Sequence, residues 1–532
     1  MTGVPPEGFT EAERAALAPH FTDLDGPVFA LTDLPEVVKG ALFARYSRSP
    51  RSLRRLWLDE FRGAEASATG HHVVDTRRAE QLYDRVFVEY GDDSVAQLGG
   101  VHIAVEGASN ILTKVLEWGR LMAYLEQSTR YIPYDDRPGG RWRYHVPEEL
   151  TGALRERYER TLDATFATYS AWLPRLSEHF ERTYPRAAGD PEGPYRMTIR
   201  AKALDTLRGL LPAATTSNVG IYATAQAYEQ LLLRMRAHPL AEARRCADAM
   251  LNELRKVIPA FLKRVDAPDR GGMWSAYLAE TRNAVAECAA GALAGTGAEP
   301  RDEVTLTDFD PEGEVKVVAA ALYAASDLPD DQLLDVARRL GAADRLAVLN
   351  AYVGKRQNRR HRPGRAFERT TYRFDVLADY GAFRDLQRHR LLTLEWQRLT
   401  PTHGYVLPEA VVDAGAESDF RAVMDEGAAL HDAIVAAGLP DVASYAVPMA
   451  YRVRFYMEMN AREAMHVVEL RSALQGHPSY RRIVQRMHRL IGEQAGHRAL
   501  AGAMTFADHS HVELERLEAE KAAERRRQRS QP

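Results

Sequence analysis

WGRLMAYLEQSTRY, residues 118–131, and RHRLLTLEWQR, residues 388–398, are the two stretches of sequence that decide how this chain is organised. In each stretch, seven residues separate an arginine, Arg120 or Arg390, from the last part of the motif. Only the second stretch has Arg-His-Arg before this gap, and only the first has Ser-x-Arg-Tyr after it. Each stretch therefore carries the part of a common pattern that the other lacks.

The order of landmarks around the two stretches also repeats. Leu-Arg, His-Pro and Arg-Arg follow one another at 233–245 and again at 470–482. Apolar and polar residues alternate at 101–105 and at 372–376, ahead of the two motifs, and this period predicts a strand in each half. The shared order predicts an internal duplication whose copies have diverged strongly.

The predicted boundary between the two copies lies near Pro300. The Ala/Gly-rich segment 284–298 is typical of a helix end that runs into a linker. We expect a first domain at 30–290, a second domain at 300–512 and a charged tail at 513–532. The tail alternates acidic and basic residues with few apolar ones, which is typical of a solvated helix.

Helical periodicity dominates outside the two predicted strands. Apolar residues recur at three- and four-residue steps over 222–236, 240–264 and 454–471, and these steps predict helices. Helices should therefore cover a modest sheet in each half.

Composition excludes several classes of protein. The formal charge of −4 and the pI near 6.5 give no overall attraction to nucleic acid or to an anionic membrane. Cys246 and Cys288 have neither the number nor the spacing for a disulfide framework or a zinc cluster, and no metal is expected. The sequence has no secretion signal and no run of about 18 apolar residues, so a cytoplasmic protein is expected.

Joined together, the two half-motifs form Arg-His-Arg, seven residues, and Ser-x-Arg-Tyr. This pattern resembles the signature of the flavin-dependent thymidylate synthases, with Glu126 also in its expected place before the serine. The resemblance implies an α+β fold of two tandem domains, each an antiparallel sheet with helices. It also implies that the Arg-His-Arg end holds FAD and that the Ser-x-Arg end holds deoxyuridylate.

The resemblance assigns nucleotide-binding residues to both halves. Arg208 begins Arg-Gly-Leu-Leu-Pro, which matches the family's Arg-x-x-Leu-Pro, whose arginine contacts the substrate phosphate. Guanidinium groups suit this task because their donors match phosphate oxygens. The residues implied to bind the nucleotide are Glu126, Ser128, Arg130, Tyr131, Arg208, Arg234 and Arg471.

The flavin-binding residues are implied only in the second half. They are Arg388, His389, Arg390, His361 in the loop before the strand, and His466 on a predicted helix. The first-half counterpart of the loop histidine is Asp92, which argues against a second full flavin site. Asp385 stands three residues before Arg388, where the family usually has a glutamine that reads the substrate.

The activity implied by the resemblance is methylation of deoxyuridylate at a composite site shared by the two repeats. FAD is the implied cofactor, with NADPH and methylenetetrahydrofolate as co-substrates, and no protein nucleophile is required. Because the family forms homotetramers, a chain with two repeats is expected to form a homodimer. The composite site can lie within one chain or between two chains.

Two other interpretations stay open. The chain can be a non-catalytic flavin- or pyrimidine-nucleotide-binding descendant of the family, because neither half keeps the whole motif. It can also be an RNA-binding protein that uses 355–373, a segment with eight Lys/Arg residues and a single acidic residue, Glu368. This segment lacks interleaved aromatic residues for base stacking, so nucleic acid ranks last among the partners.

Overall fold

The computed structural model describes residues 8–46, 49–66, 72–74 and 97–510, together with Leu517. Asp92 and the predicted tail at 513–532, apart from Leu517, lie outside the described residues. The chain forms two compact units. The first unit comprises Met1–Glu106, Leu121–Glu126 and Asn218–Thr296, and the second comprises Gly107–Arg120, Gln127–Ser217 and Gly297–Pro532.

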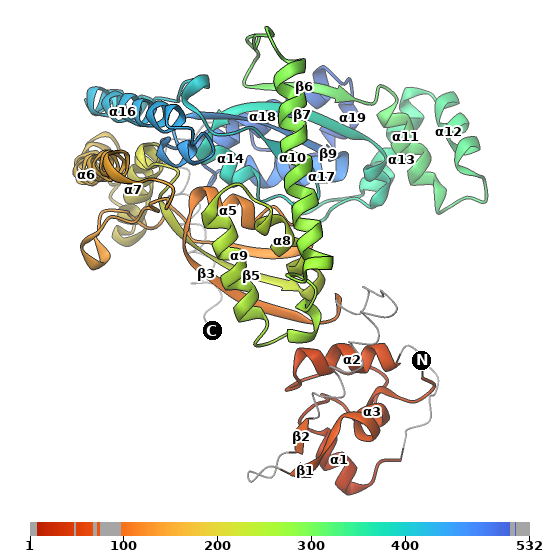
Figure 1. Ribbon diagram of the computed structural model, residues 1–532. Helices are drawn as coiled ribbons and strands as arrows, with labels where there is room; N and C mark the ends of the chain where they lie inside the picture. Colours follow the sequence, from red (N-terminus) through yellow and green to blue (C-terminus); the bar gives the residue numbers. More distant parts are fainter. Residues whose placement is uncertain (1–7, 47–48, 67–71, 75–96, 511–516, 518–532) are drawn as a thin grey trace. The chain divides into compact units, whose positions relative to one another are not determined.

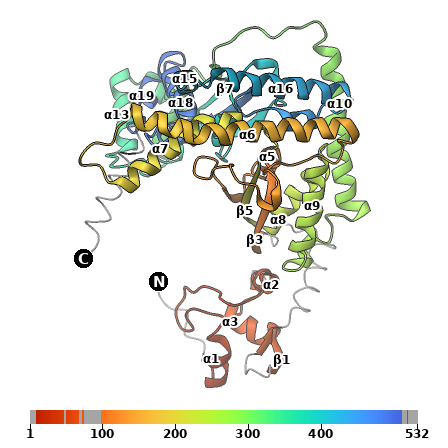
Figure 2. The ribbon, with the colours of Figure 1, turned by 90° about the vertical axis from the view of Figure 1, so that its left-hand side faces the viewer.

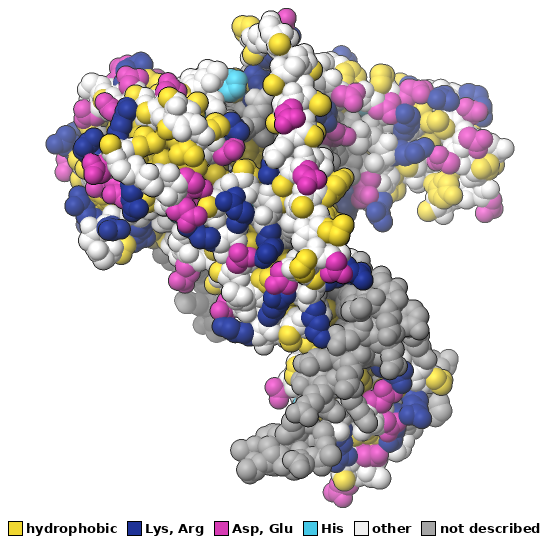
Figure 3. All heavy atoms as spheres, in the orientation of Figure 1, with side chains coloured by type: hydrophobic (Ala, Val, Ile, Leu, Met, Phe, Trp, Pro, Cys, Tyr) yellow, Lys and Arg dark blue, Asp and Glu magenta, His cyan; other side chains and the backbone are white. Residues whose placement is uncertain are grey.

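The first unit contains most of the regular structure near the start of the chain and the helices that follow β5 (Figure 1). Its elements are α1 (Glu11–Leu17), α2 (Glu36–Tyr46), α3 (Leu53–Leu56), β1 (Arg62–Ala66), β2 (His72–Val74), β4 (Met122–Glu126), α8 (Ala225–Arg236), α9 (Ala241–Leu254) and α10 (Met273–Ala292). The chain passes between the units within β3 (Gly100–Ser109) and within β5 (Thr216–Thr224). Hydrophobic side chains lie along the exposed helix α10 in Figure 3, and none of its residues is buried.

The second unit is larger and is also rich in helices. Its strands are β6 (Val304–Phe309), β7 (Thr371–Asp379), β8 (Thr393–Trp396) and β9 (Arg452–Asn460). Its helices are α5 (Asn110–Leu116), α6 (Gly152–Thr183), α7 (Glu192–Leu207), α11 (Gly313–Tyr323), α12 (Asp330–Arg339), α13 (Ala342–Val353), α14 (Tyr380–Leu386), α15 (Glu409–Asp413), α16 (Glu417–Ala436), α17 (Ala461–Arg471), α18 (Pro478–Glu493) and α19 (Arg498–Gly502). Figure 2 shows α6 and α16 side by side, joined by a hydrogen bond from Trp172 to Asp419.

The sheets confirm the internal duplication. One sheet has the strand order β3-β5-β4, and the other has the order β6-β7-β9-β8. In both, the last strand lies between the two strands that precede it in the chain: β5 lies between β3 and β4, and β9 lies between β7 and β8. The described pairs β4–β5, β7–β9 and β8–β9 are antiparallel. The tandem α+β fold with antiparallel sheets and many helices is therefore correct.

One face of the four-stranded sheet forms the centre of the core of the second unit. Residues at every second position of β9, from Val453 to Met459, are buried, as the two-residue period of a strand requires. Phe374 of β7 lies opposite Met457 of β9, and both are buried. Helices α17 and α18 pack on these strands and position the residues described below (Figure 1).

Equivalent segments of the two repeats meet inside the second unit. Pro212 and Pro448 form an antiparallel bridge. Each is the fourth residue after an equivalent position of the repeat, which is Arg208 in Arg-Gly-Leu-Leu-Pro and Ser444 in Ser-Tyr-Ala-Val-Pro. The backbone N–H of Ala213 donates to the carbonyl of Val447 at 2.9 Å. The arrangement is that of a local two-fold axis between the repeats.

The predicted elements are right in kind and wrong in several bounds. The strands predicted at 101–105 and 372–376 are present as parts of β3 and β7. The helix predicted at 454–471 begins only at Ala461, because the preceding residues form β9. The helix predicted at 222–236 begins at Ala225, after β5.

The helix predicted at 240–264 ends at Leu254, and Pro259 then starts a short 3₁₀ turn. The proline has no N–H for a helical hydrogen bond and disfavours helical backbone at the residue before it. Within the described part of the chain, none of the helices combines the length and the apolar character that crossing a bilayer requires.

Candidate functional site

Asp385, near the end of α14, is the carboxylate around which the candidate site is built. Its Oδ2 lies 3.3 Å from Nη1 of Arg208, and its Oδ1 lies 4.0 Å from Nη1 of Arg388. Arg208 follows α7 directly and is buried. A Cβ atom on Gly381 would lie 2.9 Å from the Arg208 guanidinium, so the glycine allows this arginine to pack against α14. Arginines of both repeats therefore meet at one carboxylate.

The Asp385 carboxylate remains ionised because of these arginines. Burial opposes the charge and raises the pKa of Asp385. Attraction from Arg208, and then from Arg388, Arg471 and Arg130, outweighs burial and holds this pKa below its ordinary value. The site thus contains a buried anion held by guanidinium groups.

Arg130 joins the Ser-x-Arg motif to the second repeat. It binds Asp205 of α7 through two nitrogens, with Nε–Oδ1 at 2.8 Å and Nη2–Oδ2 at 2.7 Å. Its Nη1 also donates to the hydroxyl of Tyr480 and to the carbonyl of Gln475, each at 3.3 Å. Burial raises the pKa of Asp205, but the attraction of Arg130 outweighs it and the pKa lies below its ordinary value. This ion pair fixes the direction of the Arg130 side chain.

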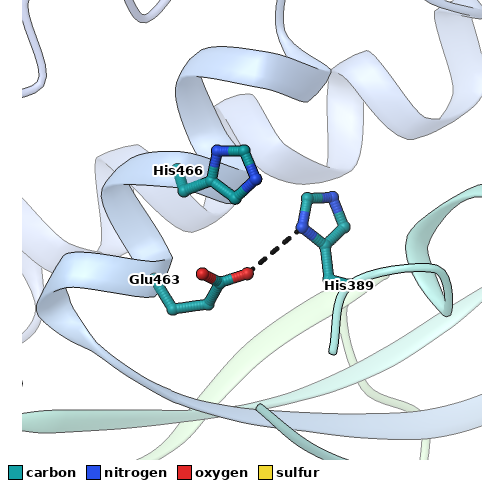
Figure 4. A group of neighbouring side chains, drawn as sticks. All are labelled: His389, Glu463 and His466. Atoms are coloured by element: carbon teal, nitrogen blue, oxygen red, sulfur yellow. Dashed lines mark hydrogen bonds and ion pairs between the residues drawn. The ribbon is translucent and has the colours of Figure 1, made fainter. Parts of the chain in front are cut away.

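A second cluster joins His389, in the loop after α14, to Glu463 and His466, one turn apart on α17 (Figure 4). Nδ1 of His389 lies 3.3 Å from the Glu463 carboxylate, and Nε of Arg471 donates to Nε2 of His389 at 2.9 Å. Because a guanidinium can only donate, Nε2 is the acceptor and Nδ1–H faces Glu463. His389 therefore links Glu463 to Arg471.

The charges around this cluster favour an anionic ligand over a metal ion. The ligand atoms of His389, Glu463 and His466 lie within 4.8 Å of one another, a spacing that a metal could use. Arg362, however, donates to Nδ1 of His466 at 2.9 Å, and Arg471 uses Nε2 of His389. Burial and the nearby arginines lower the pKa of His466 to about 4, and burial raises the pKa of Glu463 to about 7. A metal ion would compete with Arg362 and Arg471 for the ring nitrogens and would be repelled by the charges of both arginines.

The remaining predicted site residues differ in burial and in the compact unit to which they belong. Ser128 is half-buried, and its Oγ accepts from the backbone N–H of Arg130 at 3.2 Å. The exposed residues are Tyr131, Arg390 and His361. Glu126 at the end of β4 and Arg234 on α8 belong to the first unit.

A cavity of about 580 Å³ lies beside the Arg130–Asp205 pair. Phe180, Tyr184 and Lys202 line it on the side of α6 and α7, and His477 lines it on the side of α18. Neither Ser128 nor Arg388 lines this cavity. The composite site inferred from the two half-motifs stays a prediction.

The basic segment 355–373 has acidic partners inside the protein. Arg356 binds Glu469 through two nitrogens, and their side chains are only 3% and 1% exposed. Two further arginines of the segment pair with carboxylates, Arg369 with Asp330 and Arg373 with Glu458. These pairs use charges that an RNA-binding surface would need to keep free for phosphates.

Sequence reasoning missed Asp205 and Glu463, and it noted Asp385 only as a departure from the family's glutamine. Asp205 precedes Arg208 by three residues, and Asp385 precedes Arg388 by three residues. The recurrence of Asp-x-x-Arg in both halves was the available signal. Glu463 offered no such signal, because its role depends on the approach of His389 from another element.

Comparison with known proteins identifies the family. The family described as thymidylate synthase complementing protein matches residues 41–260 and, a second time, residues 305–495. The chain therefore belongs to this family and contains its domain twice. The double match agrees with the repeated strand order of the two sheets.

Two of three relatives match nearly the whole chain. A UPF0159 protein of Chlamydia pneumoniae is 38% identical over 525 residues, which cover 97% of this chain and 98% of the relative. A UPF0159 protein of Thermoplasma acidophilum is 30% identical over 509 residues, covering 91% and 97% of the two chains. A flavin-dependent thymidylate synthase of Mycobacterium sp. strain JLS is 31% identical over 182 residues, covering 34% of this chain and 67% of that protein.

Proposed function

We propose that this protein is an FAD-dependent, thymidylate synthase-like enzyme that methylates deoxyuridylate with methylenetetrahydrofolate and NADPH. The observation that carries the proposal is the meeting of Arg208, from the first repeat, and Arg388, from the second, at the Asp385 carboxylate. Arg388 belongs to the Arg-His-Arg motif that the second repeat has kept, and Arg208 begins the Arg-x-x-Leu-Pro segment that the first repeat has kept. The proposed site is therefore composite.

Arg208 is the best-placed residue for binding a nucleotide phosphate. Its side chain is buried, and its Nη2 has no hydrogen-bond partner among the described residues. A buried donor without a partner is costly, and a phosphate oxygen would satisfy it. By motif position, the other nucleotide-binding residues are Glu126, Ser128, Arg130, Tyr131, Arg234 and Arg471.

The donors of the second repeat fit the pyrophosphate of FAD. Arg390 and His361 are exposed, and Arg388 is partly exposed, so these side chains can reach a ligand from solvent. Arg362 follows His361 in the chain and donates to Nδ1 of His466. Bound FAD would supply hydride transfer and carry the methylene carbon. His389 uses both ring nitrogens inside the protein, so its part is to orient Arg471 and Glu463.

Flavin content tests the cofactor proposal. The double variant Arg388→Ala/Arg390→Ala should lose flavin, measured by absorbance of the cofactor released on denaturation, while circular dichroism stays unchanged. The matched control is Arg398→Ala/Arg421→Ala, which removes two exposed arginines of the same repeat that pair with Asp441 and Glu417. Equal flavin in both double variants would refute the assignment.

Catalysis is tested separately by tritium release from labelled deoxyuridylate with FAD, NADPH and methylenetetrahydrofolate. Release that is lost in Arg208→Ala supports the enzyme. Binding of flavin and deoxyuridylate without any release would favour the non-catalytic descendant. That alternative draws support from Arg398, which stands where Ser128 stands in the first repeat and pairs with Asp441 at the surface.

We also propose that two chains form a cytoplasmic homodimer, with domains at 30–290 and 300–512. Light scattering of the purified protein measures the first property, and a monomer at all concentrations would reject it. Separate expression of 300–512 tests the second boundary by its circular dichroism. Loss of structure in that fragment would show that the second copy needs residues 127–217, which belong to the same compact unit.

A further inference from the structure

The two oxygens of Asp385 face different arginines. Oδ2 faces Arg208, which follows α7, and Oδ1 faces Arg388, which follows α14. Arg471, from the end of α17, and Arg130, after β4, also attract this carboxylate. The side chain of Asp385 is only 14% exposed. An anion therefore already occupies the place where guanidinium groups of several elements converge.

The contacts of Asp385 are looser than those of its neighbour Asp205. The shortest approach of Arg208 to Asp385 is 3.3 Å, whereas Arg130 reaches Asp205 at 2.7 Å and 2.8 Å. Charge-assisted hydrogen bonds are strongest at about 2.7–2.9 Å. Nη2 of Arg208 has no hydrogen-bond partner among the described residues, so Asp385 satisfies this arginine only in part.

The balance of charge determines which ligand the arginines can accept. Four arginines, at 130, 208, 388 and 471, are close to three carboxylates, at 205, 379 and 385. With all of them ionised, the group has one positive charge in excess. A phosphate dianion needs about two, and a carboxylate beside it would repel it.

We propose that Asp385 is a specificity-determining residue, an internal anion that competes with ligand phosphate for Arg208 and Arg388. This inference rests on the proposed use of Arg208 for the nucleotide phosphate. Its consequence is that the wild-type protein binds phosphate-bearing ligands more weakly than its arginines alone would allow. Binding of the nucleoside part of the ligand should be unaffected.

The test compares wild type with Asp385→Asn, which keeps the shape of the side chain and removes its charge. Calorimetry measures binding of inorganic phosphate, deoxyuridine 5′-monophosphate and deoxyuridine. The variant should bind phosphate and the nucleotide at least about tenfold more tightly, with deoxyuridine unchanged. The matched control is Asp375→Asn, which removes another carboxylate paired with an arginine, Arg454 at 2.8 Å, and should change none of the three.

The outcomes separate this inference from the proposed substrate. Tighter phosphate binding by Asp385→Asn, with no nucleotide bound by either protein, would uphold the role of Asp385 and reject deoxyuridylate. An equal gain for nucleotide and nucleoside, or no gain for phosphate, would overturn the role of Asp385.

If Asp385→Asn folds poorly, thermal unfolding can still test the competition between Asp385 and phosphate. Inorganic phosphate should then stabilise Asp385→Asn, and also Asp385→Ser, more than it stabilises wild type. Equal stabilisation of all three proteins contradicts the competition.

Discussion

The segment Trp118-Gly119-Arg120 and its counterpart Arg388-His389-Arg390 have the same place in the two repeats and similar burial, but they make different contacts. Arg120 is exposed and donates to the hydroxyl of Thr393 at 3.0 Å, and Nε1 of Trp118 donates to the carbonyl of Leu394 at 3.0 Å. His389 is instead buried between Glu463 and Arg471. The first segment packs against β8 of the other repeat, while the second holds a buried polar network.

The two segments differ in what their middle residue can link. Gly119 has no side chain with which to link a helix to an arginine, so the first repeat cannot form the network around His389. The helices that follow differ in a similar way, because Leu232 of α8 is buried at the position where α17 carries Glu469. At these two positions the second repeat has a buried polar or charged side chain, His389 or Glu469, and the first repeat has none.

The largest effect is expected from Glu469→Ala. This change leaves Arg356 buried without its carboxylate and should lower the free energy of unfolding by about 3–5 kcal/mol. The control is Glu458→Ala, whose partner Arg373 is partly exposed, and it should cost less than about 1 kcal/mol. Urea unfolding followed by circular dichroism measures both, and similar losses would show that burial of the pair does not matter.

His389→Ala should have the next largest effect. It leaves Glu463 and Arg471 without their shared partner and should lower the free energy of unfolding by about 2–3 kcal/mol. Arg120→Ala removes only an exposed hydrogen bond and should change it by less than about 0.5 kcal/mol. If the two variants unfold at the same urea concentration, the contrast between the motif segments is wrong.

Acid should destabilise the protein through His477, in which burial and the repulsion of Arg208 lower the pKa from 6.5 to about 4. Between these values the unfolded chain binds more protons than the folded one, so the free energy of unfolding falls as pH falls, by at most about 1.4 kcal/mol per pH unit. His477→Asn keeps an acceptor for the N–H of Ser479 and does not titrate. Urea unfolding at about pH 5 and about pH 7 should give a smaller difference for this variant, and an equal difference would assign the acid sensitivity elsewhere.

The smallest effect is expected from Trp118→Phe. The change keeps an aromatic ring beside Trp396, whose centroid lies 5.9 Å away, and removes the hydrogen bond to Leu394. The cost should be about 1 kcal/mol in urea unfolding. Trp274→Phe, at another partly exposed tryptophan, is the control and should cost less. A cost for Trp118→Phe no larger than the control would show that this contact between repeats contributes little.

The duplication and its strands could be predicted because their signals are local. The alternation at 372–376 and the repeated Leu-Arg, His-Pro and Arg-Arg order need no knowledge of the rest of the chain. The helix predicted at 454–471 failed over its first part because its apolar residues fit both periods, and pairing with β7 made it a strand.

The acidic partners of the site could not be predicted in the same way. The role of Asp385 depends on its contact with Arg208, which is 177 residues away in the chain. In the same way, the many basic residues at 355–373 gave no indication that Arg356 pairs with Glu469, which lies 113 residues away in the chain. Charge patterns in a sequence give the donors, and only the fold decides which acceptors they meet.

The bridge between Pro212 and Pro448 has a consequence for inheritance. In a symmetric dimer, each residue at the two-fold axis faces its own copy, so every mutation there acts on both sides at once. Joining the two copies in one polypeptide removes this constraint, because each side of the axis is then encoded separately. One side of the bridge has Arg208 and the other has Ser444, and a change to either residue leaves the opposite side as it is.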